Sequence, residues 1–180
     1  MDFKEEIERD AELGTARLFA AYGARLWNTA WQMCRNAVDA EDLAMRTIEQ
    51  AVAKIGQYNA KMPIFPWLCG ILVNTHRADL RLKGRNAIDF MAEPPDTVDA
   101  RPDAAELLSR ESDARAVHAA MARLKEPDRT LLSLRYFNEL TVPQIAKIVK
   151  LPEGTVKRRI HEAKIALRAN LVRTIRPERA

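Results

Sequence analysis

Hydrophobic residues recur at spacings of three and four along most of the chain, the pattern typical of α-helices with one buried face. A first series predicts a long core helix and consists of Leu18, Phe19, Tyr22, Leu26, Ala30 and Met33. A second series consists of Ile48, Ala51, Val52 and Ile55. It predicts a helix that starts near Asp39 and Asp42, where carboxylates suit the positive end of the helix dipole. We expect the second helix to expose Asp42, Arg46 and Glu49, which can equally be explained as local ion pairs.

A third helix is predicted to start at Pro66, after a loop from Gly56 to Phe65. Its apolar face is expected to hold Leu68, Ile71, Leu72, Thr75 and Leu82, and its polar face holds Asn74, Arg77, Arg81 and Arg85. The basic face follows Trp67 and a loop that contains Asn59 and Lys61, and this combination suits the phosphates and exposed bases of single-stranded DNA. The alternative is a solvated basic face in which Asp79 is an internal partner.

The helical pattern stops from Asn86 to about Glu106, where prolines are scattered among acidic residues. This composition predicts a flexible acidic linker between two helical units. The pattern then resumes at Leu107, Leu108, Ala114, Val117, Met121 and Leu124. Pro127 is expected to open a further helix, with Leu131, Leu132, Leu134 and Tyr136 on its apolar face, that ends near Asn138.

The clearest local signals lie between Thr141 and Leu171 and predict a helix-turn-helix. Thr141 and Gln144 have the spacing of a capping box, and the breakers in residues 150–154 predict a turn. A second helix is predicted by the apolar residues Val156, Ile160, Ala163 and Leu167. Its opposite face presents Thr155, Arg158, His161 and Glu162, flanked by Lys157 and Arg159, in the place where a recognition helix contacts base edges and phosphates. An ordinary solvated helix pair is the alternative.

The formal charge of the chain is +4, and its distribution is uneven. Counting Lys and Arg against Asp and Glu gives +1 for residues 1–85, −6 for residues 86–113 and +9 for residues 114–180. The basic excess therefore lies in the unit that holds the helix-turn-helix, which favours a polyanionic partner for that unit.

Cys34 and Cys69 stand apart from any CxxC pair or histidine at ligand spacing, so the sequence indicates neither a zinc site nor a disulfide framework. The acidic N-terminus does not resemble a signal peptide, and the longest apolar run, from Phe65 to Val73, is far below the roughly 20 residues that span a bilayer. We expect a cytoplasmic protein with two reduced thiols, no metal, no cofactor and no membrane insertion.

Both informative stretches resemble, in the same order, the extracytoplasmic-function sigma factors of bacterial RNA polymerase, which belong to the sigma-70 family. The N-terminal motifs are Asp39-Ala-Glu-Asp-Leu43 and Trp67-Leu68-x-x-Ile71-x-x-Asn74-x-x-x-x-Asp79-x-Arg81. The C-terminal motifs are Leu124-x-x-Pro127-x-Arg129-x-Leu131, Leu134-Arg135-Tyr136-Phe137, Gln144-Ile145-Ala146 and Pro152-x-Gly154-Thr155-Val156-Lys157-x-Arg159. The resemblance covers roughly residues 15–172.

The resemblance implies an all-α protein with two small domains. Region 2, a helical bundle, would occupy residues 1–88, a flexible acidic linker residues 89–110, and region 4, with the helix-turn-helix, residues 111–180. Such a protein binds core RNA polymerase through the clamp helices of its largest subunit and its flap, directs it to promoter DNA and assists promoter opening. It has no catalysis of its own, and an anti-sigma factor commonly holds it inactive.

The resemblance also implies roles for individual residues. The −35 element would be read by Thr155, Lys157, Arg158, Arg159 and His161. The −10 element would be bound by Asn59, Lys61, Trp67, Asn74, Arg77 and Arg81. The polymerase would be contacted by Asp42, Leu43, Arg46 and Glu49.

The chain departs from the family at Met45 and Arg46, where Gln and an acidic residue are usual, and at Arg158, where a small polar residue is usual. We hypothesise that Arg158 changes which bases are preferred. Two other functions compete with the sigma factor. One is a regulator that binds DNA without polymerase, and the other is an enzyme that uses His76 with Asp79, or His118.

Overall fold

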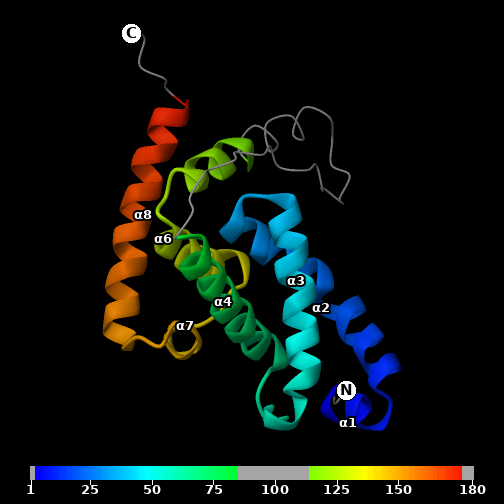
Figure 1. Ribbon diagram of the computed structural model, residues 1–180. Helices are drawn as coiled ribbons and strands as arrows, with labels where there is room; N and C mark the ends of the chain where they lie inside the picture. Colours follow the sequence, from blue (N-terminus) through cyan, green and yellow to red (C-terminus); the bar gives the residue numbers. More distant parts are fainter. Residues whose placement is uncertain (1–2, 85–113, 176–180) are drawn as a thin grey trace, which may run out of the picture.

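The computed structural model describes residues 3–84 and 114–175, and both ranges fold into helices without a strand (Figure 1). The all-α prediction is thereby confirmed for the described residues. The predicted linker, Arg85 and the helix start predicted at Leu107 and Leu108 lie outside the described residues.

The N-terminal unit consists of α1 (Phe3–Arg9), α2 (Ala11–Cys34), α3 (Ala37–Ala53), the short 3-10 helix η1 (Ile55–Gln57) and α4 (Ile64–Lys83). Side-chain caps set two of the starts. Asp10 accepts a hydrogen bond from the Leu13 N–H, and Asn36 accepts from the N–H groups of Val38 and Asp39. The second long helix therefore begins at Ala37, two residues before the predicted Asp39.

The core of the N-terminal unit contains most of the predicted apolar positions. Leu18, Leu26 and Leu68 are completely buried. Two expectations were wrong, since Phe19 is 47% exposed and Leu82 is 71% exposed. Phe19 lies beside Gly23 on the outer side of α2, and Leu82 is one residue before the C-terminal end of α4. Helix α4 begins at Ile64, two residues before the predicted start at Pro66.

The C-terminal unit begins with a helical segment over residues 114–122. It continues with α6 (Glu126–Leu132), the π-helical turn η2 (Ser133–Phe137), α7 (Val142–Val149) and α8 (Glu153–Ile175). The predicted capping box is confirmed, because Thr141 and Gln144 exchange hydrogen bonds in both directions. Tyr136, expected in the apolar face, is instead 52% exposed.

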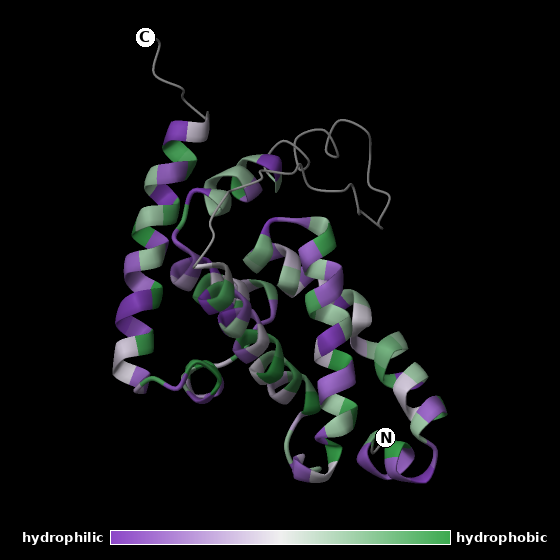
Figure 2. Cartoon of the chain, in the orientation of Figure 1, coloured by the Kyte–Doolittle hydropathy of each residue, from purple (hydrophilic) through white to green (hydrophobic). Residues whose placement is uncertain are grey.

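The two units pack against each other, with α4 beside α7 and α2 beside α6 and η2 (Figure 1). Their buried hydrophobic residues belong to one continuous cluster. In Figure 2, hydrophilic residues recur along the whole length of α8, the helix that carries the basic face. None of the helices in the described ranges has the length and apolar character needed to cross a membrane.

Candidate nucleic-acid interface

The N-terminal half of α8 has one buried and one basic side. Val156, Ile160 and Ala163 are 0%, 7% and 0% exposed, because this side packs against the rest of the C-terminal unit. Lys157, Arg158 and His161 are exposed, and Thr155 and Arg159 are half-buried. The predicted spacing of the buried residues is thus confirmed up to Ala163, and the basic side chains lie on the outer side. This geometry can place cationic side chains in a DNA groove.

The turn before α8 is tight. Lys150 ends α7 in the left-handed conformation with φ 57°, and its N–H donates to the Ala146 carbonyl. The second helix then begins at Glu153, so the turn is shorter than the predicted residues 150–154. A fixed turn holds the two helices of the motif at one angle.

Arg158 forms an ion pair with Glu162 one turn later on α8, with Nη1 3.1 Å from Oε1. Both side chains are mostly exposed, at 68% and 55%. Exposed pairs of this kind are worth roughly 0.2–1 kcal/mol. The guanidinium can therefore exchange Glu162 for a nucleic-acid acceptor at little cost.

The loop before α4 is ordered by its own side chains. Asn59 accepts a hydrogen bond from the Lys61 N–H at 3.1 Å, and both residues are exposed. The rings of Tyr58 and Trp67 lie 5.1 Å apart. A cavity of about 300 Å³ lies beside this loop and is lined by Phe3, Tyr22, Tyr58, Ala60, Met62, Pro63 and Ile64. Aromatic walls beside an exposed amide and a lysine suit an unstacked base.

The polar face of α4 is only partly open. Asn74 and Arg81 are exposed, as expected from the sequence. Arg77, which lies between them, is half-buried and donates from Nη1 to the Val149 carbonyl of α7 at 3.1 Å. The three residues share a face of α4. The guanidinium of Arg77, however, is hydrogen-bonded to the C-terminal unit.

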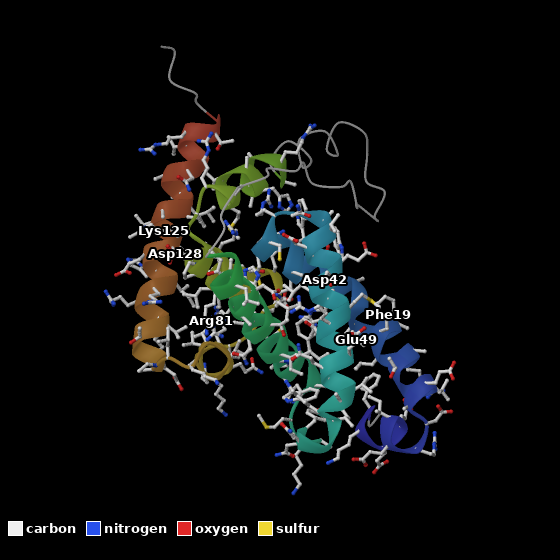
Figure 3. The ribbon with its side chains drawn as sticks, in the orientation of Figure 1. Phe19, Asp42, Glu49, Arg81, Lys125 and Asp128 are labelled. Atoms are coloured by element: carbon white, nitrogen blue, oxygen red, sulfur yellow. The ribbon has the colours of Figure 1, made fainter. Side chains whose placement is uncertain are left out.

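The residues expected to contact polymerase fall into three groups. Asp42 and Glu49 are exposed along α3 (Figure 3). Arg46 lies between them and is bound within the protein to Asp42 and to Asp79, which raises the pKa of its guanidinium. Leu43 is 1% exposed. The prediction that Leu43 touches the polymerase does not fit this burial, because a core side chain supports the surface from beneath.

The histidines considered for an enzyme have other partners. His76 is 5% exposed, and its Nε2 lies 3.4 Å from Glu126 Oε1 while its Nδ1 lies 3.7 Å from Cys34 Sγ. Asp79 binds Arg46 instead. In residues 3–84 and 114–175, no cluster of three or more His, Cys, Asp or Glu side chains could hold a metal ion.

Sequence reasoning missed the residues that join the two units. Arg25, Thr29, Arg129 and Asn138 all form hydrogen bonds across the interface. Their partners lie 96 to 113 residues away in the chain. No periodicity within a helix predicts such pairs, so the sequence offered no signal for them.

Comparison with known proteins agrees with this geometry. Residues 114–167 match the family "Sigma-70, region 4". The chain is 28% identical over 172 residues to the RNA polymerase sigma-H factor of Pseudomonas aeruginosa, covering 91% of this chain and 89% of that relative. It is 23% identical over 178 residues to the ECF RNA polymerase sigma factor SigW of Bacillus subtilis, covering 93% of this chain and 94% of that relative.

Two solved structures share the fold at 20% sequence identity. One is the sigma factor RpoE in complex with the anti-sigma factor NepR from Bartonella quintana, with a TM-score of 0.71 over 91% of this chain and 98% of that chain. The other is CnrH in complex with the cytosolic domain of CnrY, with a TM-score of 0.64 over 94% of each chain. The chain is therefore similar along nearly its whole length to RNA polymerase sigma factors, one of them of the extracytoplasmic-function group, and α7 and the start of α8 lie within the matched sigma-70 region 4.

Proposed function

We propose that this protein binds core RNA polymerase, directs it to promoters with specific −10 and −35 elements, and assists opening of the DNA without catalysis of its own. The observation that carries the proposal is the exposed basic face at the start of α8, inside a matched sigma-70 region 4. Relatives that span nearly the whole chain are RNA polymerase sigma factors by name, which supports polymerase as the partner. Such a protein would act in the cytoplasm.

The −35 element is assigned to Thr155, Lys157, Arg158, Arg159 and His161 on α8. An arginine can hydrogen-bond guanine with two donors, and a lysine can hold a phosphate. The exposure of Lys157, Arg158 and His161 supports direct contact with DNA.

The −10 element is assigned to Asn59, Lys61, Trp67, Asn74, Arg77 and Arg81. The aromatic-lined cavity beside the Asn59 loop supports capture of an unstacked base, because stacking of a base on an aromatic ring is worth roughly 1–3 kcal/mol. The exposed Asn74 and Arg81 support contact with the backbone of the opened strand.

Contact with the clamp helices of polymerase is assigned to the face of α3 that exposes Asp42 and Glu49, with Arg46 positioned beside them and Leu43 beneath. Polymerase would also bind region 4 through its flap. We assign residues 1–88 to region 2, 89–110 to the linker and 111–180 to region 4. One of the two solved structures of the same fold is, by its title, a complex with the anti-sigma factor NepR, which supports control of this chain by an anti-sigma factor.

The test is run-off transcription from a promoter library with bacterial core polymerase, with and without the protein. Transcripts that require the protein and share two spaced upstream elements are expected. The variant Lys157→Ala with Arg158→Ala should abolish most of them, whereas Arg168→Ala, an exposed arginine farther along α8, should retain them. Binding of the promoter duplex without any transcript would instead favour a regulator that acts without polymerase.

A further inference from the structure

A thiol, an imidazole and a carboxylate form a row between α2, α4 and α6. Cys34 is the last residue of α2, and its Sγ lies 3.7 Å from Nδ1 of His76 on α4, within the range of a hydrogen bond to sulfur. Nε2 of the same imidazole lies 3.4 Å from Oε1 of Glu126 on α6. We call Cys34, His76 and Glu126 the thiol row. Its members are not among the residues assigned above to DNA or polymerase.

The carboxylate of the thiol row decides which nitrogen of His76 carries the proton. Burial raises the pKa of Glu126, but the contacts with His76 and Thr130 and the charge of Arg129 outweigh burial and lower it. The Thr130 hydroxyl donates to Oε1 at 2.7 Å. Glu126 is therefore a carboxylate at neutral pH, and it favours a proton on the Nε2 that faces it. The lone pair of Nδ1 is then directed at Cys34 and can accept the thiol proton.

Proton transfer from Cys34 to His76 would place one cation between two anions. The imidazole is 5% exposed, so little water screens the charges on either side of it. An imidazolium flanked by a thiolate and a carboxylate is stabilised by both neighbours, and it stabilises the thiolate in return. The thiolate is the nucleophilic form of cysteine. The thiol row therefore has the arrangement that activates a thiol.

The end of α2 opposes a thiolate only weakly. The negative end of a helix dipole disfavours an anion, and Cys34 is the last residue of the helix. Two carbonyls at this end are already hydrogen-bonded, because the Arg35 N–H donates to Trp31 and Arg129 Nη2 donates to Met33 at 2.8 Å. The guanidinium of Arg129 also brings positive charge next to Cys34, which favours the thiolate.

Cys69 is the opposite case within the same chain. Its side chain is 0% exposed, and burial raises the pKa of its thiol to about 12 although Arg25 has a lowering effect. A thiol in such surroundings is inert. Cys34 is partly exposed, so a small reagent can reach the sulfur. Cys69 therefore serves as an internal reference for the reactivity of Cys34.

We propose that Cys34 is an oxidation site, at which the thiolate formed by proton transfer to His76 reacts with hydrogen peroxide to give a sulfenic acid. A sulfur lone pair attacks one peroxide oxygen, so that the S–O bond forms as the O–O bond breaks. The sulfur is oxidised and the peroxide is reduced. The departing hydroxide takes the proton from Nδ1 of His76 and leaves as water. This chemistry is independent of the proposed function, because it concerns side chains outside the assigned DNA and polymerase surfaces.

Alkylation of the full chain with iodoacetamide, mapped by peptide mass spectrometry, tests the activation. The reference is the same chain in urea, where Cys34 reacts as an ordinary thiol with a pKa of about 8.5. At pH 6 native Cys34 should react about tenfold faster than in urea, and the ratio should decrease toward pH 9. Cys69 should be labelled in urea alone. Native labelling of Cys34 at pH 6 that is no faster than in urea would overturn the proposal.

The variant His76→Gln tests the role of the imidazole. Its amide can accept a hydrogen bond from the thiol but cannot take the proton, so the pH profile of Cys34 labelling should approach that of an ordinary thiol. His118→Gln is the matched control, because His118 lies beside the same helix end but contacts Gln32, and it should keep the wild-type profile. The charged groups next to Cys34 in the chain or packed near it are the same in both variants, namely Arg35, Asp39, Glu126 and Arg129.

Cys69 also shows whether a variant stays folded. Labelling of Cys69 without urea would show that His76→Gln has opened the core. In that case Glu126→Gln replaces it, since the Glu126 side chain is more exposed, at 23%, and its loss should shift the profile in the same direction by a smaller factor. An unchanged profile in either variant, with Cys69 unlabelled, would overturn the proposal.

Exposure of the wild type to hydrogen peroxide in the presence of dimedone, which traps sulfenic acids, tests the oxidation itself. A dimedone adduct is expected at Cys34 and not at Cys69, and its rate of formation at pH 6 should fall several-fold in His76→Gln. Cys34→Ser should give no adduct. If native Cys34 is alkylated rapidly but forms no adduct, the assignment of an oxidation site is wrong.

Discussion

Arg46 on α3 and Asp79 on α4 are joined by two parallel hydrogen bonds, from Nη2 to Oδ1 at 2.9 Å and from Nη1 to Oδ2 at 3.1 Å. The same guanidinium also donates to Asp42 at 2.9 Å. Arg46 is one of the two departures on this helix from the family pattern that the sequence resembles. It links two helices of the N-terminal unit.

Arg46→Ala should therefore lower the free energy of unfolding by on the order of 1 kcal/mol, because a two-pronged pair is stronger than an ordinary surface ion pair. Chemical denaturation with urea measures this change. Arg158→Ala is the matched control, since its pair with Glu162 is more exposed and should contribute only a few tenths of a kcal/mol. Equal effects of the two substitutions would contradict the linking role of Arg46.

Two glycines in long helices should respond oppositely to alanine. A Cβ at Gly14 would lie 2.8 Å from the backbone N and Cα of Ile7, so Gly14→Ala should destabilise the protein by about 1–3 kcal/mol. A Cβ at Gly70 of α4 meets nothing within 4 Å, and Gly70→Ala should stabilise by up to about 1 kcal/mol. Thermal unfolding of both variants checks the signs. A stable Gly14→Ala protein would mean that α1 can move away from α2.

His118 should make stability depend on pH. Burial and the nearby Arg35 lower the pKa of His118. Its Nδ1 lies 3.3 Å from Gln32 Nε2 and accepts the amide proton when the ring is neutral. In the unfolded chain, this histidine takes up a proton at a higher pH than in the folded protein. The free energy of unfolding should therefore decrease as the pH falls below about 6.5.

Urea unfolding at several values between pH 7.5 and pH 5.5 measures this dependence. His118→Gln should flatten the curve, because this variant has no imidazole to protonate at that position. An unchanged slope in His118→Gln would assign the pH dependence to other groups.

Arg158 and Lys157 should differ in their effects on promoter choice. If Arg158 contacts a base edge, Arg158→Ala should alter the preference at one or two positions of the −35 element, each by about 1–3 kcal/mol. Lys157→Ala should weaken binding to all −35 sequences by the same factor, as expected of a phosphate contact. Binding to a library of −35 duplexes measures both. Uniform weakening by Arg158→Ala would make Arg158 a phosphate contact and end the specificity hypothesis.

Local patterns in the sequence determined the helices and their ends. Thr141 and Gln144 formed the predicted capping box, and Val156, Ile160 and Ala163 formed the predicted buried side of α8. These predictions succeeded because a helix has a fixed period and because a cap needs partners only three residues away. The exposed basic side of α8 followed from the same period.

Only the tertiary structure decided which side chains are exposed and free of partners on other helices. Phe19 and Leu82 fit an apolar pattern yet are exposed, because the helices in residues 3–84 and 114–175 leave their positions uncovered. Arg46 and Arg77 fit polar faces, yet one binds Asp79 and the other binds the Val149 carbonyl. The spacing of residues along one helix contains no information about such partners. They depend on how separate helices pack, and here that packing also joins the two units through arginines at helix ends.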